Sequence, residues 1–357
     1  MSEDSLKYCF KNDYSVLGHP LILSTLSAAH AEQFDGYGHD KHSVNAAGIL
    51  CSIFDAPDAD VHFVSGGTQA NLVVISSVLR PHEAVIAPCA GHIFVHETGA
   101  IEAAGHKICT REGKNGKLSV CDIKSVLDEH TDEHMVKPRL VYLSLSTESG
   151  TVYTKAELSE ISAFCKENGL YIHLDGARLG AGINSSACDL TYPDIANLVD
   201  VFYVGGTKNG ALFGEAIVIC NDLLTEDFRF IMKQRGALLA KGVSIGMQFE
   251  TLFSIPENQN RFLYDINALH ANNMAKRLAD GISALGYNFL YPVETNIILP
   301  VFPESVVGKL HKLYDFYVWS RENNEVAIRL VTSWATPQDM IDTFIADLSE
   351  MSMSEMS

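Results

Sequence analysis

The chain has 357 residues, of which 47% are hydrophobic and 20% are charged, and its formal net charge is −18. This length and composition are ordinary for a soluble globular protein and leave room for one large α/β domain and a smaller one. The negative charge argues against a nucleic-acid partner, and no stretch is long and apolar enough to span a bilayer.

The cysteines and the two ends of the chain bear on its compartment. Eight cysteines stand singly, with no Cys-x-x-Cys pair, so we expect reduced thiols in a cytoplasmic protein. Residues 1–7 lack the basic start and apolar core of a secretory signal. Residues 351–357 are low in complexity, and a flexible tail is predicted there.

Most of the chain shows an alternation of strand and helix patterns. Residues 1–55 are less regular, and we expect them to pack on the large domain or on a neighbouring subunit. From there, short apolar runs alternate with helical patterns, which predicts a mostly parallel, doubly wound sheet in a large domain over 56–254. Six runs lack polar alternation, as strands buried on both faces do: 61–64, 84–87, 140–145, 171–174, 201–204 and 216–219.

One connecting helix is marked at both ends. Thr154 can serve as its N-cap, and Glu157 three residues later completes a capping box. An apolar stripe follows over 158–165, and Gly169 is placed to end the helix.

The pattern changes after residue 254. A helix is predicted at 272–285, a strand at 296–301, a helix at 306–314 and a strand at 326–331. A last helix begins at Thr336-Pro337, an N-cap followed by proline. Residues 255–350 are therefore predicted to form a small C-terminal α+β domain.

The first candidate binding motif follows the strand at 61–64. Gly66 and Gly67 let the backbone approach a ligand closely, and free N–H groups at the start of the next helix attract an anion. Thr68 adds a hydroxyl donor. The motif is not G-x-G-x-x-G and no Walker lysine follows, and a glycine turn of this kind can also be a plain connection.

Two further segments carry candidate polar groups. A neutral imidazole at His92 can stack on a planar cofactor ring, whereas His92 and His96 together could instead bind zinc or serve only as structural histidines. Glu148 follows the strand at 140–145, where it could accept a proton or orient a substrate hydroxyl, unless it is an exposed loop residue.

The strongest motif is His-Leu-Asp-Gly-Ala-Arg, which contains Asp175 and Arg178, taken together with Lys208 further along. A lysine amine can form a Schiff base with an aldehyde, and an ionised aspartate can keep a pyridine nitrogen protonated. The pair describes a site for pyridoxal 5′-phosphate (PLP). Arg178 could hold a substrate carboxylate or polarise the cofactor oxygen, and Arg329, inside an apolar strand, could grip an α-carboxylate unless it forms a structural salt bridge.

Taken in order, Gly66-Gly67-Thr68, His92, Asp175-Gly-Ala-Arg178, Lys208 and Arg329 resemble the threonine aldolase family. That family belongs to the β-eliminating lyase-like, fold-type I PLP-dependent enzymes, and the resemblance covers nearly the whole chain. It implies a homodimer or homotetramer with shared active sites. It also implies catalytic roles for Lys208, His92, Glu148 and Asp175, substrate contacts for Arg178 and Arg329, and a cofactor site made by Gly66, Gly67, Thr68, His92, Asp175, Arg178, Thr207 and Lys208.

Several segments differ from the family or match it less closely. Asn12 stands where many members carry a serine that helps to bind the substrate carboxylate. Around Glu148, many members have a histidine that contacts the β-hydroxyl, whereas this chain has the loop Ser-Thr-Glu-Ser-Gly-Thr. Tyr37 lies in a segment that resembles one near a neighbour's cofactor, and Lys241 could reach a phosphate across an interface. Asn12 and Tyr37 are thus expected at the substrate, and Lys241 at the cofactor.

The resemblance implies PLP-dependent aldol cleavage of an L-3-hydroxy-α-amino acid, of the threonine or allo-threonine type, to glycine and an aldehyde. Lys208 would carry the Schiff base, and the base that takes the β-hydroxyl proton would be Glu148, His92 or an ordered water. The same residues would serve a β-eliminating lyase, an aminotransferase or a racemase. A metal-dependent hydrolase leaves Asp175, Lys208 and Arg329 unexplained. Loss of the lysine would favour an inactive scaffold protein, and Lys208 is present.

Overall fold

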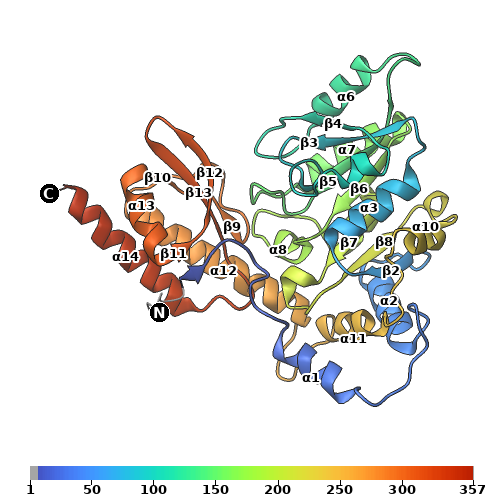
Figure 1. The fold of residues 1–357 in the computed structure, drawn as a ribbon, viewed down its shortest axis with the longest axis horizontal. Coiled ribbons are helices and arrows are strands. Elements are labelled where there is room, and N and C mark those ends of the chain that lie inside the picture. Colours follow the sequence, from blue (N-terminus) through green and yellow to red (C-terminus); the bar gives the residue numbers. More distant parts are fainter. Residues whose placement is uncertain (1–6, 357) are drawn as a thin grey trace.

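The computed structural model describes residues 7–356 of the chain, and the expectations for residues 1–6 and for Ser357 lie outside that range. Figure 1 shows two groups of elements, one around a large sheet and one, in orange and red, around a smaller sheet. None of the described helices combines the length and the apolarity that a membrane crossing requires.

The large sheet has seven strands, and five consecutive ones are parallel, which confirms the mostly parallel sheet predicted from the sequence. Only β8, next to the edge strand, runs antiparallel to both of its neighbours. Across the sheet the order is β2 (Asp60–Val64), β8 (Glu215–Ile219), β7 (Val201–Gly205), β6 (Tyr171–Asp175), β5 (Lys137–Ser144), β3 (Glu83–Pro88) and β4 (Ile108–Arg111).

The predicted strand at each apolar run is present, and β4 was missed. Its sequence, Ile-Cys-Thr-Arg, is short and half polar, and it lies at the edge of the sheet, where one flank needs no apolar cover. Such a strand lacks the continuous apolar run that is typical of strands buried on both faces.

The register of the strands brings their functional ends to one edge of the sheet. Ser144 at the end of β5 is opposite Asp175 at the end of β6. Because β8 is antiparallel, its first residue, Glu215, is opposite Gly205 at the end of β7 and Val64 at the end of β2. Ligands of such sheets bind beyond the carboxyl ends of the parallel strands, so this edge is where a site is expected.

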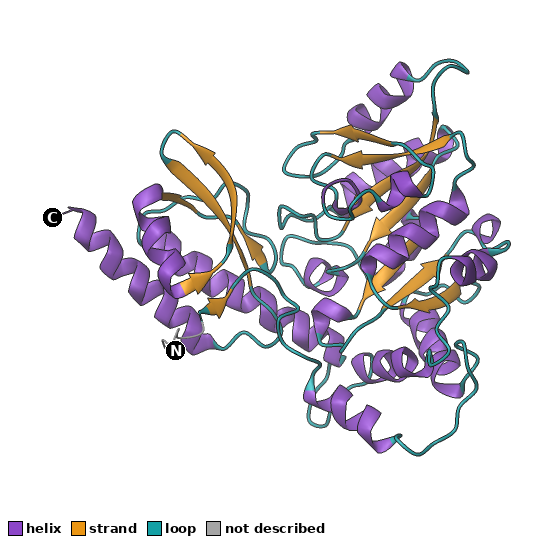
Figure 2. Cartoon of the chain, viewed as in Figure 1, coloured by secondary structure: helices purple, strands orange, loops and turns teal. Residues whose placement is uncertain are grey.

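Helices connect and flank these strands, as Figure 2 shows in purple. They are α1 (Pro20–Ala28), α2 (Lys41–Ile53), α3 (Gly67–Val78), α4 (His92–Val95), α5 (Ala100–Ala103), α6 (Val120–Glu129), α7 (Lys155–Glu167), α8 (Leu179–Ile183), α9 (Tyr192–Leu198), α10 (Phe228–Gln234) and α11 (Val243–Leu252).

The capping box predicted for α7 is confirmed. The Thr154 hydroxyl accepts the N–H of Glu157 at 3.2 Å, and the Glu157 carboxylate accepts the N–H of Thr154 at 2.8 Å. Gly169 follows the helix with φ of +64°, in the left-handed region that favours glycine.

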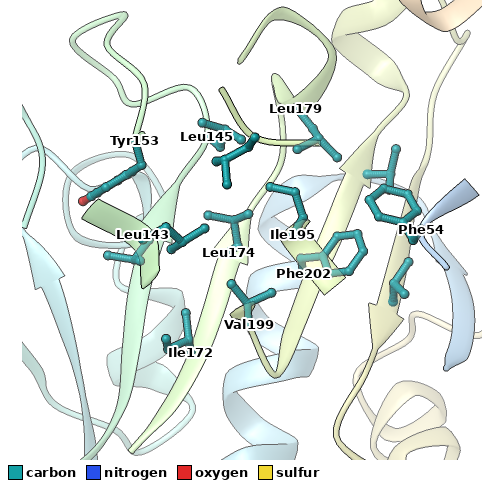
Figure 3. Packing of buried hydrophobic residues seen from close by; sticks show 14 of the residues in the cluster. Phe54, Leu143, Leu145, Tyr153, Ile172, Leu174, Leu179, Ile195, Val199 and Phe202 are labelled. Atoms are coloured by element: carbon teal, nitrogen blue, oxygen red, sulfur yellow. The ribbon is translucent and has the colours of Figure 1, made fainter. Parts of the chain in front are cut away.

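The main core lies where side chains of neighbouring strands meet the helices. Figure 3 shows Leu143 of β5, Leu174 of β6 and Phe202 of β7, which come from three adjacent strands and pack with side chains such as Ile195 of α9. Close packing of these buried side chains holds the strand ends in fixed positions relative to one another.

The C-terminal elements form a second sheet with a separate core. They are α12 (Leu263–Ala284), β9 (Ile297–Ile298), β10 (Val301–Pro303), α13 (Glu304–Leu313), β11 (Tyr314–Asp315), β12 (Tyr317–Glu322), β13 (Glu325–Val331) and α14 (Gln338–Met356). The strand predicted at 296–301 is divided into β9 and β10, which both pair with β13. β12, which is largely exposed, was missed.

The N-terminal segment contacts both groups of elements. β1 (Tyr8–Cys9) pairs with β11, while α1 and α2 pack on α11. Because α14 continues to Met356, helix extends into the predicted tail over 351–357. The domain limits, the contact of the N-terminal segment with a neighbouring subunit, and the flexibility of the tail stay predictions.

Candidate active site

Lys208 lies in the short turn η1 (Thr207–Asn209), directly after β7. Burial lowers the pKa of its amine below the usual value, and the positive charge of Arg178 acts in the same direction. A lysine with a lowered pKa holds more of its amine in the neutral, nucleophilic form.

Asp175 ends β6 and is held as a carboxylate by donors on every side. Oδ1 accepts the Tyr203 hydroxyl at 2.5 Å and the Ala177 N–H at 3.0 Å, while Oδ2 accepts the Tyr142 hydroxyl at 2.6 Å and the Asn71 amide at 3.1 Å. Burial alone would raise the pKa of Asp175, but the tyrosine hydrogen bonds hold it below the ordinary value. A buried negative charge of this kind suits a protonated ring nitrogen.

Glu215, at the start of β8, supports the turn that carries Lys208. Its Oε2 accepts the N–H of Gly206 at 2.8 Å and its Oε1 accepts the Thr207 hydroxyl at 2.7 Å. Burial raises the pKa of Glu215 to about 7.

His92 begins α4, and its Nδ1 donates to Oε1 of Glu97 at 2.8 Å. Burial would lower the pKa of His92, but the hydrogen bond to Glu97 and the charges of Glu148 and Asp175 raise it above the ordinary value. His96 is largely exposed and its ring lies 5.5 Å from that of His92, but partial desolvation still holds its pKa below the ordinary value.

Arg178 is buried, and two of its three guanidinium nitrogens donate hydrogen bonds to Asp13. Its Nε donates to Oδ2 of Asp13 at 2.7 Å and its Nη2 donates to Oδ1 at 3.1 Å, while the Asn296 amide also donates to Oδ2, at 3.0 Å. The third nitrogen, Nη1, lies 3.9 Å from Oε1 of Glu148.

Glu148 and Arg329 form an ion pair, although they come from different parts of the fold. Nη2 of Arg329, on β13, is 3.4 Å from Oε2 of Glu148, which follows β5. Burial would raise the pKa of Glu148, but Arg178 and Arg329 hold it below the ordinary value. Nε of Arg329 is buried and has no hydrogen-bond partner among residues 7–356.

Gly66 and Gly67 lie at the start of α3, where Gly66 is the N-cap and no side chain caps the helix. A Cβ on Gly66 would meet no atom within 4 Å, whereas a Cβ on Gly67 would lie 2.9 Å from the Tyr203 hydroxyl. Thr68 is exposed beside them. Uncapped N–H groups next to open space form a suitable cradle for a phosphate.

Three predicted site residues have other surroundings within the described chain. Asn12 precedes Asp13, and its Oδ1 accepts from the Tyr14 N–H and the Ser15 hydroxyl. Tyr37 is exposed under the ammonium of Lys233, 4.5 Å from the ring centre.

Lys241 is exposed in the turn that precedes α11. Its neighbour Ala240 accepts the backbone N–H of Tyr37, so Tyr37 and Lys241 lie together. Within the described residues neither makes a hydrogen bond or ion pair with Lys208, and their contribution to a neighbour's site stays a prediction.

The sequence did not single out Asn71, Glu97, Asp13, Tyr142 or Tyr203. Glu215 was also missed, although a signal for it existed, because a carboxylate beside an apolar strand is the feature that identified Asp175. Asp13 gives no local signal, since its partners Arg178 and Asn296 are far away in the sequence.

Comparison with known proteins agrees with this geometry. A family model described as beta-eliminating lyase matches residues 20–304. A low specificity L-threonine aldolase of a Pseudomonas species is 33% identical over 98% of both chains. A solved structure of Leishmania major threonine aldolase is 47% identical, with a TM-score of 0.93, and covers 97% of this chain and 99% of its own.

More distant structures share the fold. An aspartate aminotransferase of Thermus thermophilus, 13% identical, has a TM-score of 0.72 and covers 97% of this chain and 91% of its own. It confirms the fold-type I architecture expected from the sequence, with a mostly parallel central sheet. The family match, the two relatives and the shared fold agree: the chain belongs to the beta-eliminating lyase family, with the threonine aldolases among its relatives.

Proposed function

We propose that the chain binds PLP and cleaves an L-3-hydroxy-α-amino acid of the threonine or allo-threonine type to glycine and an aldehyde. The observation that carries the proposal is that Lys208, ionised Asp175 and Glu148 all lie at or just after strand ends at one edge of the large sheet, where Arg329 of β13 pairs with Glu148. The named activity of the relatives that cover nearly the whole chain supports it. The alternative of a β-eliminating lyase, aminotransferase or racemase is not favoured by these relatives.

The residues present fit the cofactor. Lys208 would hold its aldehyde carbon, Asp175 its ring nitrogen and the start of α3, with Gly66, Gly67 and Thr68, its phosphate, while His92 would lie against the ring. When bound, PLP withdraws electrons from the substrate α-carbon and so stabilises the negative charge left there by bond cleavage.

Arg329 is the better placed of the two arginines to bind the substrate carboxylate. Its buried Nε is free among the described residues, whereas two donors of Arg178 already bind Asp13. Fixing the carboxylate at Arg329 orients the substrate, and this orientation selects the bond between the α- and β-carbons. Arg178 then contributes through Nη1 and through its positive charge.

Glu148 is the group we assign to accept the β-hydroxyl proton. Its carboxylate is ionised because Arg178 and Arg329 lower its pKa. When a substrate carboxylate takes Arg329, that stabilisation of the charged form weakens, so Glu148 becomes a stronger base at the time it is needed.

We further propose a homodimer or homotetramer in which Tyr37 and Lys241 act at a neighbour's site, and a cytoplasmic location. The exposure of Tyr37 and Lys241, which lie next to each other, supports the first point. The eight cysteines, which are all free, support the second.

The test is direct. Purified protein with PLP should convert L-threonine or L-allo-threonine to acetaldehyde and glycine, and Lys208→Ala should abolish both this turnover and the visible absorbance of the bound cofactor. Lys276→Ala, which removes an exposed lysine of α12 instead, should keep the absorbance. Bound PLP without aldehyde from any β-hydroxy amino acid would refute the aldolase assignment.

A further inference from the structure

Glu97 is a buried carboxylate next to the site to which the sequence assigns no role. It lies between α4 and α5, its side chain is completely shielded from solvent, and Oε1 accepts both Nδ1 of His92 and Nδ2 of Asn71, each at 2.8 Å. Oε2 is buried with no hydrogen-bond partner among the described residues. Burial raises the pKa of Glu97, and the hydrogen bonds from His92 and Asn71 oppose this rise. Burying an ionised carboxylate costs free energy, which indicates a role for Glu97 at the site.

Asn71 links Glu97 to Asp175. Its Nδ2 also donates to Oδ2 of Asp175, at 3.1 Å, and its Oδ1 accepts from Nε2 of His173 at 2.9 Å. Burial lowers the pKa of His173 to about 4, so this ring is neutral at physiological pH. Because Nδ2 of Asn71 donates to both carboxylates, its Oδ1 faces His173, and the neutral ring carries its proton on Nε2.

The same geometry fixes the proton on one nitrogen of His92. An ionised carboxylate only accepts hydrogen bonds, so Nδ1 of His92 carries a proton in both charge states of the ring while Glu97 is ionised. Nε2 makes no hydrogen bond to any described residue and is the nitrogen left to titrate.

Other charged groups also face His92. The carboxylates of Glu148 and Asp175 favour its charged form and the Lys208 ammonium opposes it, and the His96 ring lies 5.5 Å away. Within residues 7–356, Glu97 is the charged group that hydrogen-bonds to His92.

We propose that Glu97 is a positioning residue that holds the Nδ1 proton of His92 and leaves Nε2 to gain or lose a proton at the reacting face. Asn71 couples this pair to Asp175, so that the charge on His92 and the charge under the ring nitrogen respond to each other. The use of the Nε2 proton in turnover rests on the proposed aldolase function, whereas the His92–Glu97 coupling does not.

Titration of single histidines tests the coupling without reference to activity. Hydrogen–deuterium exchange at the imidazole C2, followed by mass spectrometry on the full-length protein with and without PLP, gives a titration midpoint for each histidine. Glu97→Gln should lower the midpoint of His92 by about one pH unit or more, because a charged partner is lost. His96, in the same peptide, has no hydrogen bond to Glu97 and serves as the internal reference.

An unchanged His92 midpoint, or equal shifts at His92 and His96, would overturn the proposal. Should Glu97→Gln fail to fold, the wild-type protein and Glu97→Asp still decide the matter. In both, His92 must titrate at a higher pH than His96, and the opposite order would contradict the proposal.

A double-mutant cycle separates positioning from simple structural support. If Glu97 acts through His92, Glu97→Gln should lower kcat/KM for L-threonine by about 10-fold or more in the wild type, but by less than about 2-fold in a His92→Asn background. Losses that multiply would show that Glu97 acts independently of His92. A protein that makes no aldehyde would refute the aldolase function and leave the C2-exchange result standing.

Discussion

Asp175 and Glu215 are buried carboxylates on either side of Lys208, and they differ in how their charge is stabilised. Asp175 accepts four hydrogen bonds, which outweigh its burial and lower its pKa. Glu215 accepts two, and burial raises its pKa to about 7. The difference lies in the number of donors, and it predicts opposite pH behaviour for the two residues.

We expect Glu215 to make the cofactor-free protein less stable as pH rises. Its folded-state pKa of about 7 is above the ordinary 4.5, so the folded protein binds more protons than the unfolded chain between these values. The stabilisation is complete below pH 4.5 and is lost as pH rises through about 7. It amounts to up to about 3 kcal/mol, from the size of the pKa shift.

Urea unfolding at pH 5 and pH 8, at one fixed protein concentration, checks this. The loss of unfolding free energy between the two pH values should be smaller in Glu215→Gln than in the wild type, because glutamine does not titrate. Equal losses would mean that Glu215 titrates normally in the folded protein.

At the scale of elements, two adjacent glycines at the start of α3 have different surroundings: Gly67 packs tightly against Tyr203, whereas Gly66 faces open space. The Cβ of an alanine at position 67 would lie 2.9 Å from the Tyr203 hydroxyl, whereas at position 66 it would enter free space. Tyr203 donates to Asp175, so displacing its ring also disturbs the carboxylate.

Gly67→Ala and Gly66→Ala therefore form a matched pair. We expect Gly67→Ala to destabilise the fold by about 1–3 kcal/mol, since it overpacks a buried contact. Gly66→Ala should keep the wild-type stability and weaken PLP binding, because its Cβ occupies the cradle proposed for the phosphate.

Thermal unfolding of the cofactor-free variants and PLP titration by absorbance give the two quantities. The idea fails if Gly66→Ala binds PLP as tightly as the wild type, or if Gly67→Ala is as stable as the wild type.

Elements with a strong local pattern could be predicted from the sequence, and contacts between elements could not. The capping box of Thr154 and Glu157 uses residues three apart, so the sequence alone contains it. Asp175 was found because a charge ends an apolar strand. The pairing of Arg178 with Asp13 spans 165 positions, and no periodicity records such a distance. β12 was missed because its side chains are mostly exposed and carry no burial pattern.

At the scale of the whole molecule, three parts of the chain meet at the site. Asp13 comes from the N-terminal segment, Arg178 follows β6 of the large sheet, and Asn296 precedes β9 of the small one. Arg329 on β13 reaches Glu148 from the small sheet in the same way. The two arginines proposed to bind the substrate carboxylate therefore depend on how these parts are held together, and Asp13 bonds to both Arg178 and Asn296.

Asp13→Asn is the variant that tests this dependence. It removes the negative charge from a buried ion pair and leaves the Arg178 cation without its main partner, which should lower the unfolding free energy by about 3–5 kcal/mol. It should also raise KM for the amino acid more than it lowers kcat, because Arg178 loses its fixed orientation near the substrate carboxylate. Lys11→Gln is the matched control two residues away.

Lys11 pairs with Asp315 at 3.6 Å, but both side chains are more than a third exposed, and such a pair contributes about 0–1 kcal/mol. Denaturant unfolding and steady-state kinetics of both variants should therefore show a large effect for Asp13→Asn and almost none for Lys11→Gln. If the two variants lose similar stability, or if Asp13→Asn keeps the wild-type KM, the N-terminal segment does not organise the site. In that case, the two sheets alone would hold Arg178 and Arg329 in position.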